Sequence, residues 1–240
     1  MQILTPENLG ENFEAKPEML KGRVIMVTGA GDGIGRSAAL TYAKHGATVV
    51  LVGKTVNKLE RVYDEIEANS GPEAAIYPIH FEGATPHDYD EMANVLETNF
   101  GRLDGLLHNA AIHPYLSRIK DYEPEDWMKV MQVNINAPFL ITQSLMSLLE
   151  KSESARIAFT TDDVGSQGKA FWGAYSASKF ALEGLAQTLS EELEKTPIEV
   201  RLINPGPTLT SLRKRIFPGE QNTALKPPET LSDLHLAAMV

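Results

Sequence analysis

The feature that most constrains this chain is an apolar run that leads into a glycine-rich turn and then a helical pattern. Residues 24–27 are continuously apolar, as in a strand buried on both faces of a parallel sheet. The turn follows at residues 28–35, and the helical pattern ends at His45 before Gly46. Glycines let the backbone approach a pyrophosphate, and a helix N-terminus offers free N–H groups. This order favours a dinucleotide site over a plain tight turn, with candidate residues Gly29, Asp32, Gly33, Ile34 and Gly35.

Further strand-like runs alternate with helical patterns along the rest of the chain. The runs cover residues 48–52, 75–81, 103–111, 155–160 and 199–203. The helical patterns cover residues 57–69, 87–100, 124–150, about 175–194 and 229–240. Strands that alternate with helices predict an α/β fold. We expect a Rossmann-type doubly wound parallel sheet in three layers, forming a single domain over residues 21–240.

Three segments are expected to depart from this regular pattern. Residues 1–20 are mixed and acidic, and we predict an irregular lead-in there. Pro78 is unusual for a central strand, because proline cannot donate to the ladder of hydrogen bonds. Residues 211–227 are rich in charge and proline, which predicts a loop over the substrate within about residues 206–228.

Composition excludes several classes of function. The net charge of −10 argues against a nucleic-acid partner and against an anionic membrane surface. The chain has no cysteine, so disulfides and thiolate chemistry are excluded, and its histidines show no metal-ligand spacing. Neither a secretory signal nor an apolar run of about 20 residues is present. We therefore expect a cytoplasmic protein without a membrane segment.

The second strand ends in Gly53 and Lys54, where such sheets contact the adenosine ribose. A cation at this tip suits a 2′-phosphate, whereas an acidic residue suits a 2′-hydroxyl. Lys54 therefore favours NADP(H), although it could also be a solvated surface lysine. Asp32 favours NAD instead, because it places a negative charge nearby. The prediction is NADP(H), with NAD possible.

Tyr175 and Lys179 are four residues apart within a helical pattern, which places both side chains on one face. A lysine beside a tyrosine favours the phenolate and is expected to lower the pKa of the phenol. A tyrosine tuned in this way is a candidate general acid and base near neutral pH. The spacing alone also fits two unrelated surface residues. Its significance therefore depends on the other strand-end motifs.

Together these motifs resemble the short-chain dehydrogenase/reductase family from about Lys21 onward. The turn at residues 28–35 is similar to the family's cofactor turn, and residues 108–111 to its Asn-Asn-Ala-Gly motif. Asn134 matches the family's helix asparagine, and residues 204–206 match its nicotinamide-side turn. Several short segments resemble those of the bacterial YciK-like oxidoreductases. The resemblance implies cofactor contacts from the glycine turn and Lys54, and also from Phe81, Asn109, Ala110, Tyr175, Lys179, Pro205, Gly206 and Thr208.

The resemblance also implies a reaction. Tyr175 would exchange a proton with a carbonyl or alcohol oxygen while hydride moves to or from the nicotinamide. Lys179 would lower the pKa of Tyr175 and bind the nicotinamide ribose, and Asn134 would hold a water in a proton relay. The implied partner is a small-molecule carbonyl or alcohol. By resemblance alone, the protein is expected to be a homodimer or homotetramer.

The departures from the family pattern bear on activity. The family's substrate-polarising serine lies thirteen residues before the tyrosine, and that position is Asp162. A carboxylate cannot donate a hydrogen bond unless it is protonated, and its charge would repel a developing oxyanion. Thr161 could substitute only if the loop shifts, and Ser166 is a weaker candidate. Burial could also keep Asp162 protonated.

Three further positions differ from the pattern. His80 stands where the family usually has the acidic residue that meets the adenine. His108 and Ala111 replace the first and last residues of the Asn-Asn-Ala-Gly motif. The strand that the family places after the last helix is absent from this sequence, so either the protein ends early or that tail lies outside it.

Two functions therefore remain open from the sequence. One is an NADP(H)-dependent oxidoreductase with Tyr175, Lys179, Asn134 and Asp162 at its catalytic site. The other is a nucleotide-binding protein on the same fold with little or no activity, because of Asp162. Phe171 and Trp172 suggest an apolar pocket, yet packing against the sheet would need the same residues. The sequence does not identify the substrate.

Overall fold

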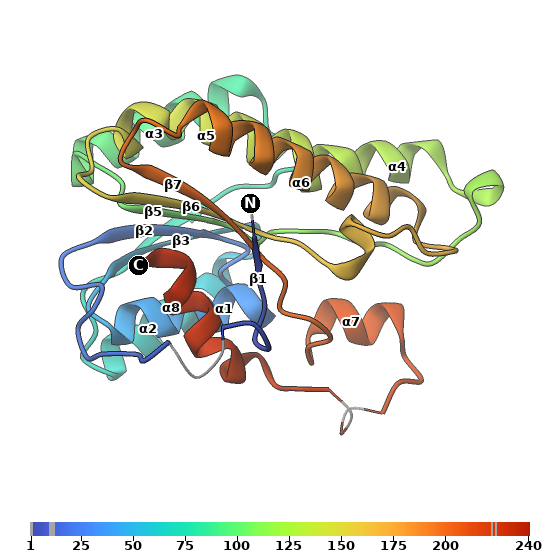
Figure 1. Cartoon of the computed structure of the whole chain (residues 1–240), viewed down its shortest axis with the longest axis horizontal. Helices are drawn as coiled ribbons and strands as arrows, with labels where there is room; N and C mark the ends of the chain where they lie inside the picture. The colour runs from blue at the N-terminus through green and yellow to red at the C-terminus, as the bar shows by residue number, and fades with distance from the viewer. Residues whose placement is uncertain (1, 10–12, 222, 224) are drawn as a thin grey trace.

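The computed structural model describes residues 2–9, 13–221, 223 and 225–240, which form a seven-stranded sheet between two layers of helices (Figure 1). Its strand order is β1-β7-β6-β5-β2-β3-β4, and every pair of neighbours is parallel. The predicted Rossmann-type doubly wound sheet is thereby confirmed. The strands are β1 (Ile3–Leu4), β2 (Val24–Thr28), β3 (Thr48–Gly53), β4 (Ala75–Pro78), β5 (Gly105–His108), β6 (Ala155–Thr160) and β7 (Ile198–Ile203).

The helices divide between the two faces of the sheet (Figure 1). One face is covered by α1 (Gly33–Lys44), α2 (Val56–Ala68) and α8 (Ser232–Met239). The other face is covered by α3 (Pro86–Phe100), α4 (Pro124–Met131), α5 (Ala137–Leu149) and α6 (Gly173–Glu192). A π-helical turn at Gln132–Asn136 joins α4 to α5, so the long helix predicted over residues 124–150 is interrupted.

The strands are apolar on both faces because both faces are covered. Alternate side chains of a strand point to opposite faces. In β2, Ile25 and Val27 therefore belong to the core shared with α1, α2 and α8. Met26 between them belongs to the core shared with α5 and α6. The continuous apolar run that predicted this strand is thus a direct consequence of two cores.

The chain reverses its direction of travel across the sheet between β2 and β5. From β2 it moves outward through β3 to β4, and then returns to form β5 on the other side of β2. At such a reversal the loops leave in opposite directions and open a crevice at the carboxyl ends of the strands. This crevice is where the predicted site residues converge.

The predicted irregular lead-in is wrong at Ile3 and Leu4, which pair with Leu202 and Ile203 of β7. The N-terminal segment thus occupies the sheet edge beside β7, and the sheet has seven strands although none follows α8. A two-residue strand has no period that a sequence pattern could reveal. Residues 1 and 10–12 of this segment lie outside the described residues.

The loop predicted over residues 211–227 also needs correction, since it begins with the short helix α7 (Ser211–Ile216). The Thr210 hydroxyl accepts a hydrogen bond from the backbone N–H of Arg213 at 3.1 Å and caps this helix. Residues 222 and 224 lie outside the described part of the loop. Pro78 ends β4, the edge strand of the sheet, where a missing donor leaves no ladder bond unmade.

Candidate active site

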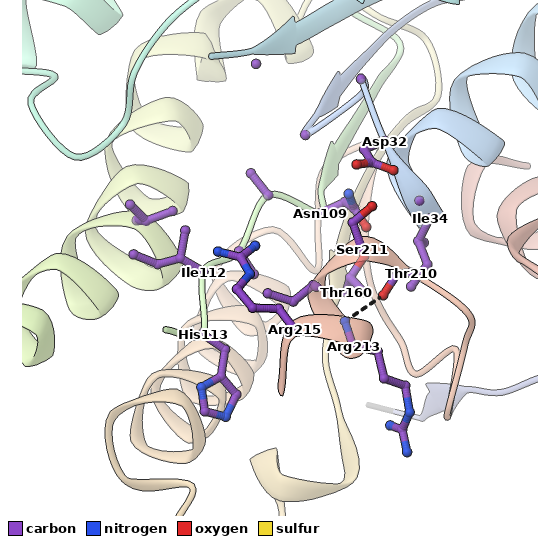
Figure 2. A pocket seen from close by; sticks show the side chains of 18 of the residues that line it. Asp32, Ile34, Asn109, Ile112, His113, Thr160, Thr210, Ser211, Arg213 and Arg215 are labelled. Atoms are coloured by element: carbon purple, nitrogen blue, oxygen red, sulfur yellow. Dashed lines mark hydrogen bonds between the residues drawn. The ribbon is translucent and has the colours of Figure 1, made fainter. Parts of the chain in front are cut away.

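A cleft of about 330 Å³ opens at the carboxyl ends of β2, β3, β5, β6 and β7 (Figure 2). This is large enough for a cofactor-sized ligand. Of the predicted site residues, only Gly35 and Asn134 are outside the set that lines this cleft. The residues that line it are Gly29, Asp32, Gly33, Ile34, Lys54, Phe81, Asn109, Ala110, Asp162, Tyr175, Lys179, Pro205, Gly206 and Thr208.

The glycine turn holds β2, α1 and β5 in close contact. Gly29 and Gly33 have φ angles of +69° and +52°, a region that side-chain-bearing residues rarely adopt. A Cβ at Gly29 would lie 3.0 Å from Cα of Ala110. A Cβ at Gly35 would overlap the carbonyl oxygen of Gly29 and lie 2.5 Å from Nδ2 of Asn109. Gly35 therefore shapes the turn from behind, although it does not line the cleft.

Thr28 at the end of β2 connects the turn to β5, and sequence reasoning did not identify it. Its hydroxyl accepts hydrogen bonds from the backbone N–H groups of Asn109 and Ala110, at 3.0 and 3.1 Å, and donates to the Leu107 carbonyl at 3.2 Å. The Asn109 side chain donates back to the Thr28 carbonyl at 3.2 Å. The two strand ends at the crevice are thus fixed to each other. The position of Thr28 immediately before Gly29 was the only available signal.

Two lysines carry positive charge to the β3 end of the cleft. Lys54 Nζ lies 3.5 Å from Glu82 Oε1, and both side chains remain partly exposed. Lys58, which sequence reasoning missed, donates to Asp32 Oδ2 at 2.5 Å. Burial raises the pKa of Asp32, but hydrogen bonds from Lys58 and Ser211 outweigh it and hold the pKa below its usual range. The negative charge at Asp32 is thus paired, which weakens its argument for NAD.

Tyr175 and Lys179 lie on α6 and face the cleft from one side. Lys179 Nζ lies 5.4 Å from the centroid of the Tyr175 ring and donates to the Thr160 carbonyl at 2.7 Å. Burial lowers the pKa of Lys179 to about 8, against the carboxylates of Asp162 and Glu183. A lysine with this pKa exchanges its proton more readily near neutral pH than an exposed one.

The pKa of Tyr175 is raised, whereas a lowered value was expected from its neighbour Lys179. Burial raises the pKa of Tyr175, and the Asp162 carboxylate raises it further. The side chain is 7% exposed, so little water reaches the hydroxyl to solvate a phenolate. The proton therefore stays on Tyr175 at neutral pH, as a general acid requires.

Asp162 follows β6, and its side chain accepts a hydrogen bond from the Val164 N–H at 3.2 Å. Burial raises the pKa of Asp162, while the Val164 N–H and the Lys179 cation oppose the shift. The carboxyl group lines the same cleft as Tyr175 and Lys179. The predicted juxtaposition of these three side chains is therefore present.

Neither hydroxyl considered as a replacement for the family serine can act as one here. The Thr161 hydroxyl donates to Glu183 Oε1 at 2.5 Å and is buried with it. The Ser166 hydroxyl bonds the Asp163 carbonyl at 3.3 Å, and Ser166 is outside the cleft lining. Asp162 shares the β6 end of the cleft with Thr160, whose hydroxyl has no hydrogen-bond partner among the described residues.

This arrangement agrees with a comparison of the whole chain. A family model described as short chain dehydrogenase matches residues 23–221. The chain belongs to the short-chain dehydrogenase family. It is 42% identical over 228 residues to the uncharacterized oxidoreductase YciK of Escherichia coli K12, covering 95% of this chain and 90% of YciK. The resemblance to YciK-like oxidoreductases is thereby confirmed.

Solved structures of family members superimpose closely. A protein assigned as a short chain dehydrogenase from Pseudomonas syringae has a TM-score of 0.93 and 48% identity, covering 95% of this chain and 93% of that one. Another assigned as a short chain dehydrogenase, from E. coli CFT073 and complexed with NADPH, has a TM-score of 0.91 and 43% identity. That match covers 94% of this chain and 93% of the neighbour.

Asn134, which matches the family's helix asparagine, lies in the π-helical turn and contacts α6, the helix of Tyr175 and Lys179. Its side-chain oxygen accepts from the Ile112 N–H at 2.8 Å, and its amide donates to the Ile112 carbonyl and the Ser178 hydroxyl, both at 3.0 Å. Three partners occupy the side chain, so it fixes the β5 loop against α6. A water relay through Asn134 would have to use its backbone carbonyl instead of its side chain.

His108, which replaces the first asparagine of the Asn-Asn-Ala-Gly motif, is a core residue. Its Nε2 lies 2.8 Å from the Thr142 hydroxyl, and its ring stacks on Phe159 at 4.7 Å between centroids. Burial lowers its pKa to about 3. His80, by contrast, lines the cleft and is exposed beside Glu82.

An aromatic wall, formed by His113, Trp172, Tyr175 and Phe217, bounds the cleft next to the catalytic pair. The His113 ring stacks on Tyr175 with 4.7 Å between centroids, and burial lowers its pKa to about 4. Trp172 lies 5.8 Å from both Tyr175 and Phe217. Of the two residues predicted for an apolar pocket, Trp172 lines the cleft, and Phe171 is half-exposed outside it.

Within the described residues, no three histidine or acidic side chains are grouped so that they could hold a metal ion. The described helices also include none that is both long and apolar enough to cross a membrane.

Proposed function

We propose that this short-chain dehydrogenase transfers hydride between NADP(H) and a carbonyl or secondary alcohol, with Tyr175 as the acid and base. The observation that carries the proposal is that Tyr175 and Lys179 face the cleft into which the glycine turn also opens. Gly29, Gly31 and Gly33 support a dinucleotide there, because they line the cleft without side chains that would keep its phosphates from the backbone.

The residues of the turn and strand ends would hold the cofactor. The N–H groups at the start of α1 favour the pyrophosphate, because a helix N-terminus attracts anions. Lys54 supports a preference for NADP(H), since its ammonium group suits the 2′-phosphate. Asn109, Pro205 and Gly206 line the path toward the catalytic pair. When bound, the cofactor supplies or accepts the hydride.

The chain's own residues would handle the proton. In the reducing direction the Tyr175 hydroxyl donates its proton to the substrate oxygen, which would otherwise become an alkoxide. The Lys179 ammonium group stabilises the phenolate that remains, since it lies close to the ring and its carbonyl partner fixes its position. Asn134 connects the loop after β5 to α6, the helix that carries this pair.

A second function deserves the same test, because one observation favours it. Asp162 places a carboxyl group where a hydrogen-bond donor is expected, and it raises the pKa of Tyr175. A charged Asp162 would oppose negative charge on a substrate oxygen. The alternative is a protein that binds the nucleotide with weak or no turnover. For either function we propose a cytoplasmic homodimer or homotetramer that acts without nucleic acid or membrane.

Titration with NADPH and NADH, followed by turnover assays on a panel of carbonyl compounds, tests both functions. We expect tighter binding of NADPH and oxidation of NADPH by at least one substrate class. Tyr175→Phe should bind NADPH as the wild type does and lose turnover, because only the hydroxyl is removed. Turnover that survives this substitution would exclude Tyr175 from the reaction. Binding without turnover of any compound would favour the alternative.

A further inference from the structure

The group that the β6 end presents to the reacting atoms is a carboxyl, and its surroundings hold it in place. One side-chain oxygen of Asp162 accepts the Val164 N–H. The charges that act on it come from Lys179 on α6, from Asp163 beside it and from Arg213 on α7. Arg213 is itself engaged by both carboxylate oxygens of Glu220, at 2.7 Å each. Burial and Asp163 raise the pKa of Asp162, whereas the Val164 N–H, Lys179 and Arg213 oppose the shift. The carboxyl group lines the same cleft as Tyr175 and Lys179.

A carboxyl group in this place is poorly suited to a carbonyl substrate. Hydride addition to a carbonyl builds negative charge on oxygen, which a carboxylate repels. The nearby Thr161 hydroxyl cannot relieve this, because it donates to Glu183. Reduction of a C=N bond requires stabilisation of positive charge instead. Its nitrogen is basic, becomes cationic when protonated, and is stabilised by an adjacent carboxylate.

The aromatic wall supplies the apolar part of the site. Trp172, Tyr175 and Phe217 line the same cleft as Asp162. A cation of the protein already lies over each ring, Lys169 over Trp172, Lys179 over Tyr175 and Arg213 over Phe217. The wall therefore favours the apolar carbons of a ring, and Asp162 is the group that would meet its nitrogen.

We propose that the acceptor in this cleft is the C=N bond of a cyclic imine and that Asp162 carries the proton for its nitrogen. The proposal deepens the proposed function, since it rests on hydride transfer with NADP(H) at this site. It replaces the oxygen that Tyr175 would protonate with a nitrogen served by Asp162. Tyr175 and Lys179 then position the substrate ring and the cofactor.

The step balances in atoms and electrons. The Asp162 carboxyl group gives its proton to the imine nitrogen, forming an iminium and a carboxylate. The iminium carbon receives hydride from NADPH, so the C=N π bond breaks while a C–H bond forms. The imine is reduced to an amine, and NADPH is oxidised to NADP⁺. Asp162 then takes a proton from water at the mouth of the cleft.

The test compares 2-methyl-1-pyrroline with cyclopentanone, a five-membered ring that has C=O in place of C=N. We expect the wild type with NADPH to show a kcat/KM at least tenfold higher for the imine. Asp162→Ser should lower the imine value by about a hundredfold, the usual contribution of a general acid, and raise the ketone value. Asp162→Asn keeps an acceptor for the Val164 N–H and should lose the imine activity as well.

Two further measurements separate catalysis from structure. The wild-type imine rate should fall as pH rises through the pKa of Asp162, and residual activity in Asp162→Asn should lack this limb. Asp64→Ser removes an exposed carboxylate on α2, outside the cleft lining, and should keep the imine preference. Thermal unfolding and NADPH binding show that each variant is folded.

The other possible results of these assays would each contradict one of the proposals. If the wild type reduces the ketone faster than the imine, or if Asp162→Ser keeps the imine rate, the imine proposal fails while the oxidoreductase function stands. If the wild type binds NADPH and turns over neither compound nor the carbonyl panel, both proposals fail. If NADPH does not bind, the cofactor assignment fails first.

Discussion

Three buried histidines make the stability of this protein strongly dependent on pH between neutral and mildly acidic conditions. His108, His113 and His235 are each no more than 3% exposed. Burial lowers their pKa values to about 3, about 4 and about 3. No described group is placed to hydrogen-bond either ring nitrogen of His113 or His235. In the unfolded chain all three regain an ordinary pKa near 6.5.

The sign and size of the effect follow from proton linkage. Because the folded pKa values are depressed, the unfolded state binds more protons below about pH 6.5, so stability is full above that pH and falls as pH falls. Each histidine then contributes a loss of about 1.4 kcal/mol per pH unit. Because the unfolded histidines are only half protonated at pH 6.5, the three together lose about 3 kcal/mol between pH 6.5 and pH 5.5, a large part of a typical 5–15 kcal/mol. Asp162 opposes this in part, because its raised pKa favours the folded state on acidification.

The assay is urea unfolding followed by circular dichroism across this pH window. We expect the free energy of unfolding to decrease steeply in the wild type. His235→Leu should show a slope smaller by about one third, because one of three titrating groups is removed. It should be no less stable at neutral pH, since no hydrogen bond is lost. His87→Gln, at an exposed position, is the control and should keep the full slope. A flat wild-type profile, or an unchanged slope in His235→Leu, would refute the reasoning.

Two further predictions concern the cofactor end of the cleft. Gly35→Ala should destabilise the protein by about 1–3 kcal/mol in thermal unfolding and weaken NADPH binding, because its Cβ would overlap the Gly29 carbonyl. The control is Gly184→Ala, which should be tolerated because a Cβ there meets nothing within 4 Å. Equal behaviour of the two variants would contradict the steric argument. Lys54→Ala should weaken NADPH binding about tenfold or more and leave NADH binding unchanged, since a hydrogen bond to a charged group is worth about 1.5–3 kcal/mol. Lys195→Ala, at an exposed position, is the control in both titrations. An equal loss of affinity for both cofactors would show that Lys54 does not bind the 2′-phosphate.

The site residues that directly follow a strand could be predicted from the sequence. The apolar runs locate the strands, and in a parallel sheet the crevice lies at the carboxyl ends of the strands. Gly29, Asn109 and Gly206 are each at a strand end, and the fold brings them together. Contacts between segments distant in sequence could not be predicted. The pairing of Lys58 with Asp32 depends on how α2 packs beside the turn. The stacking of His113 on Tyr175 depends on the path of a loop that has no sequence period.

The raised pKa of Tyr175 could not be predicted either, because it also depends on contacts between segments distant in sequence. From the sequence, only the neighbouring Lys179 could be counted, and it favours ionisation. Burial of the ring and the position of the Asp162 carboxyl group are properties of the folded chain, and both oppose ionisation. A spacing of four residues gives proximity, but the dielectric surroundings determine which protonation state prevails.

The edge strand β1 is synthesised early, but it pairs with β7, which is synthesised late and leads into the site. It joins Ile3 to Leu202 in a parallel ladder, and the Leu4 carbonyl accepts the Asn204 N–H at 2.8 Å, directly before the Pro205-Gly206 turn. During translation β1 emerges first, yet it has no partner until β7 has been made. Contacts this distant in sequence form slowly. The Pro205-Gly206 turn is therefore fixed late in folding, and Leu4→Pro, which disturbs β1 outside the cleft, would loosen it.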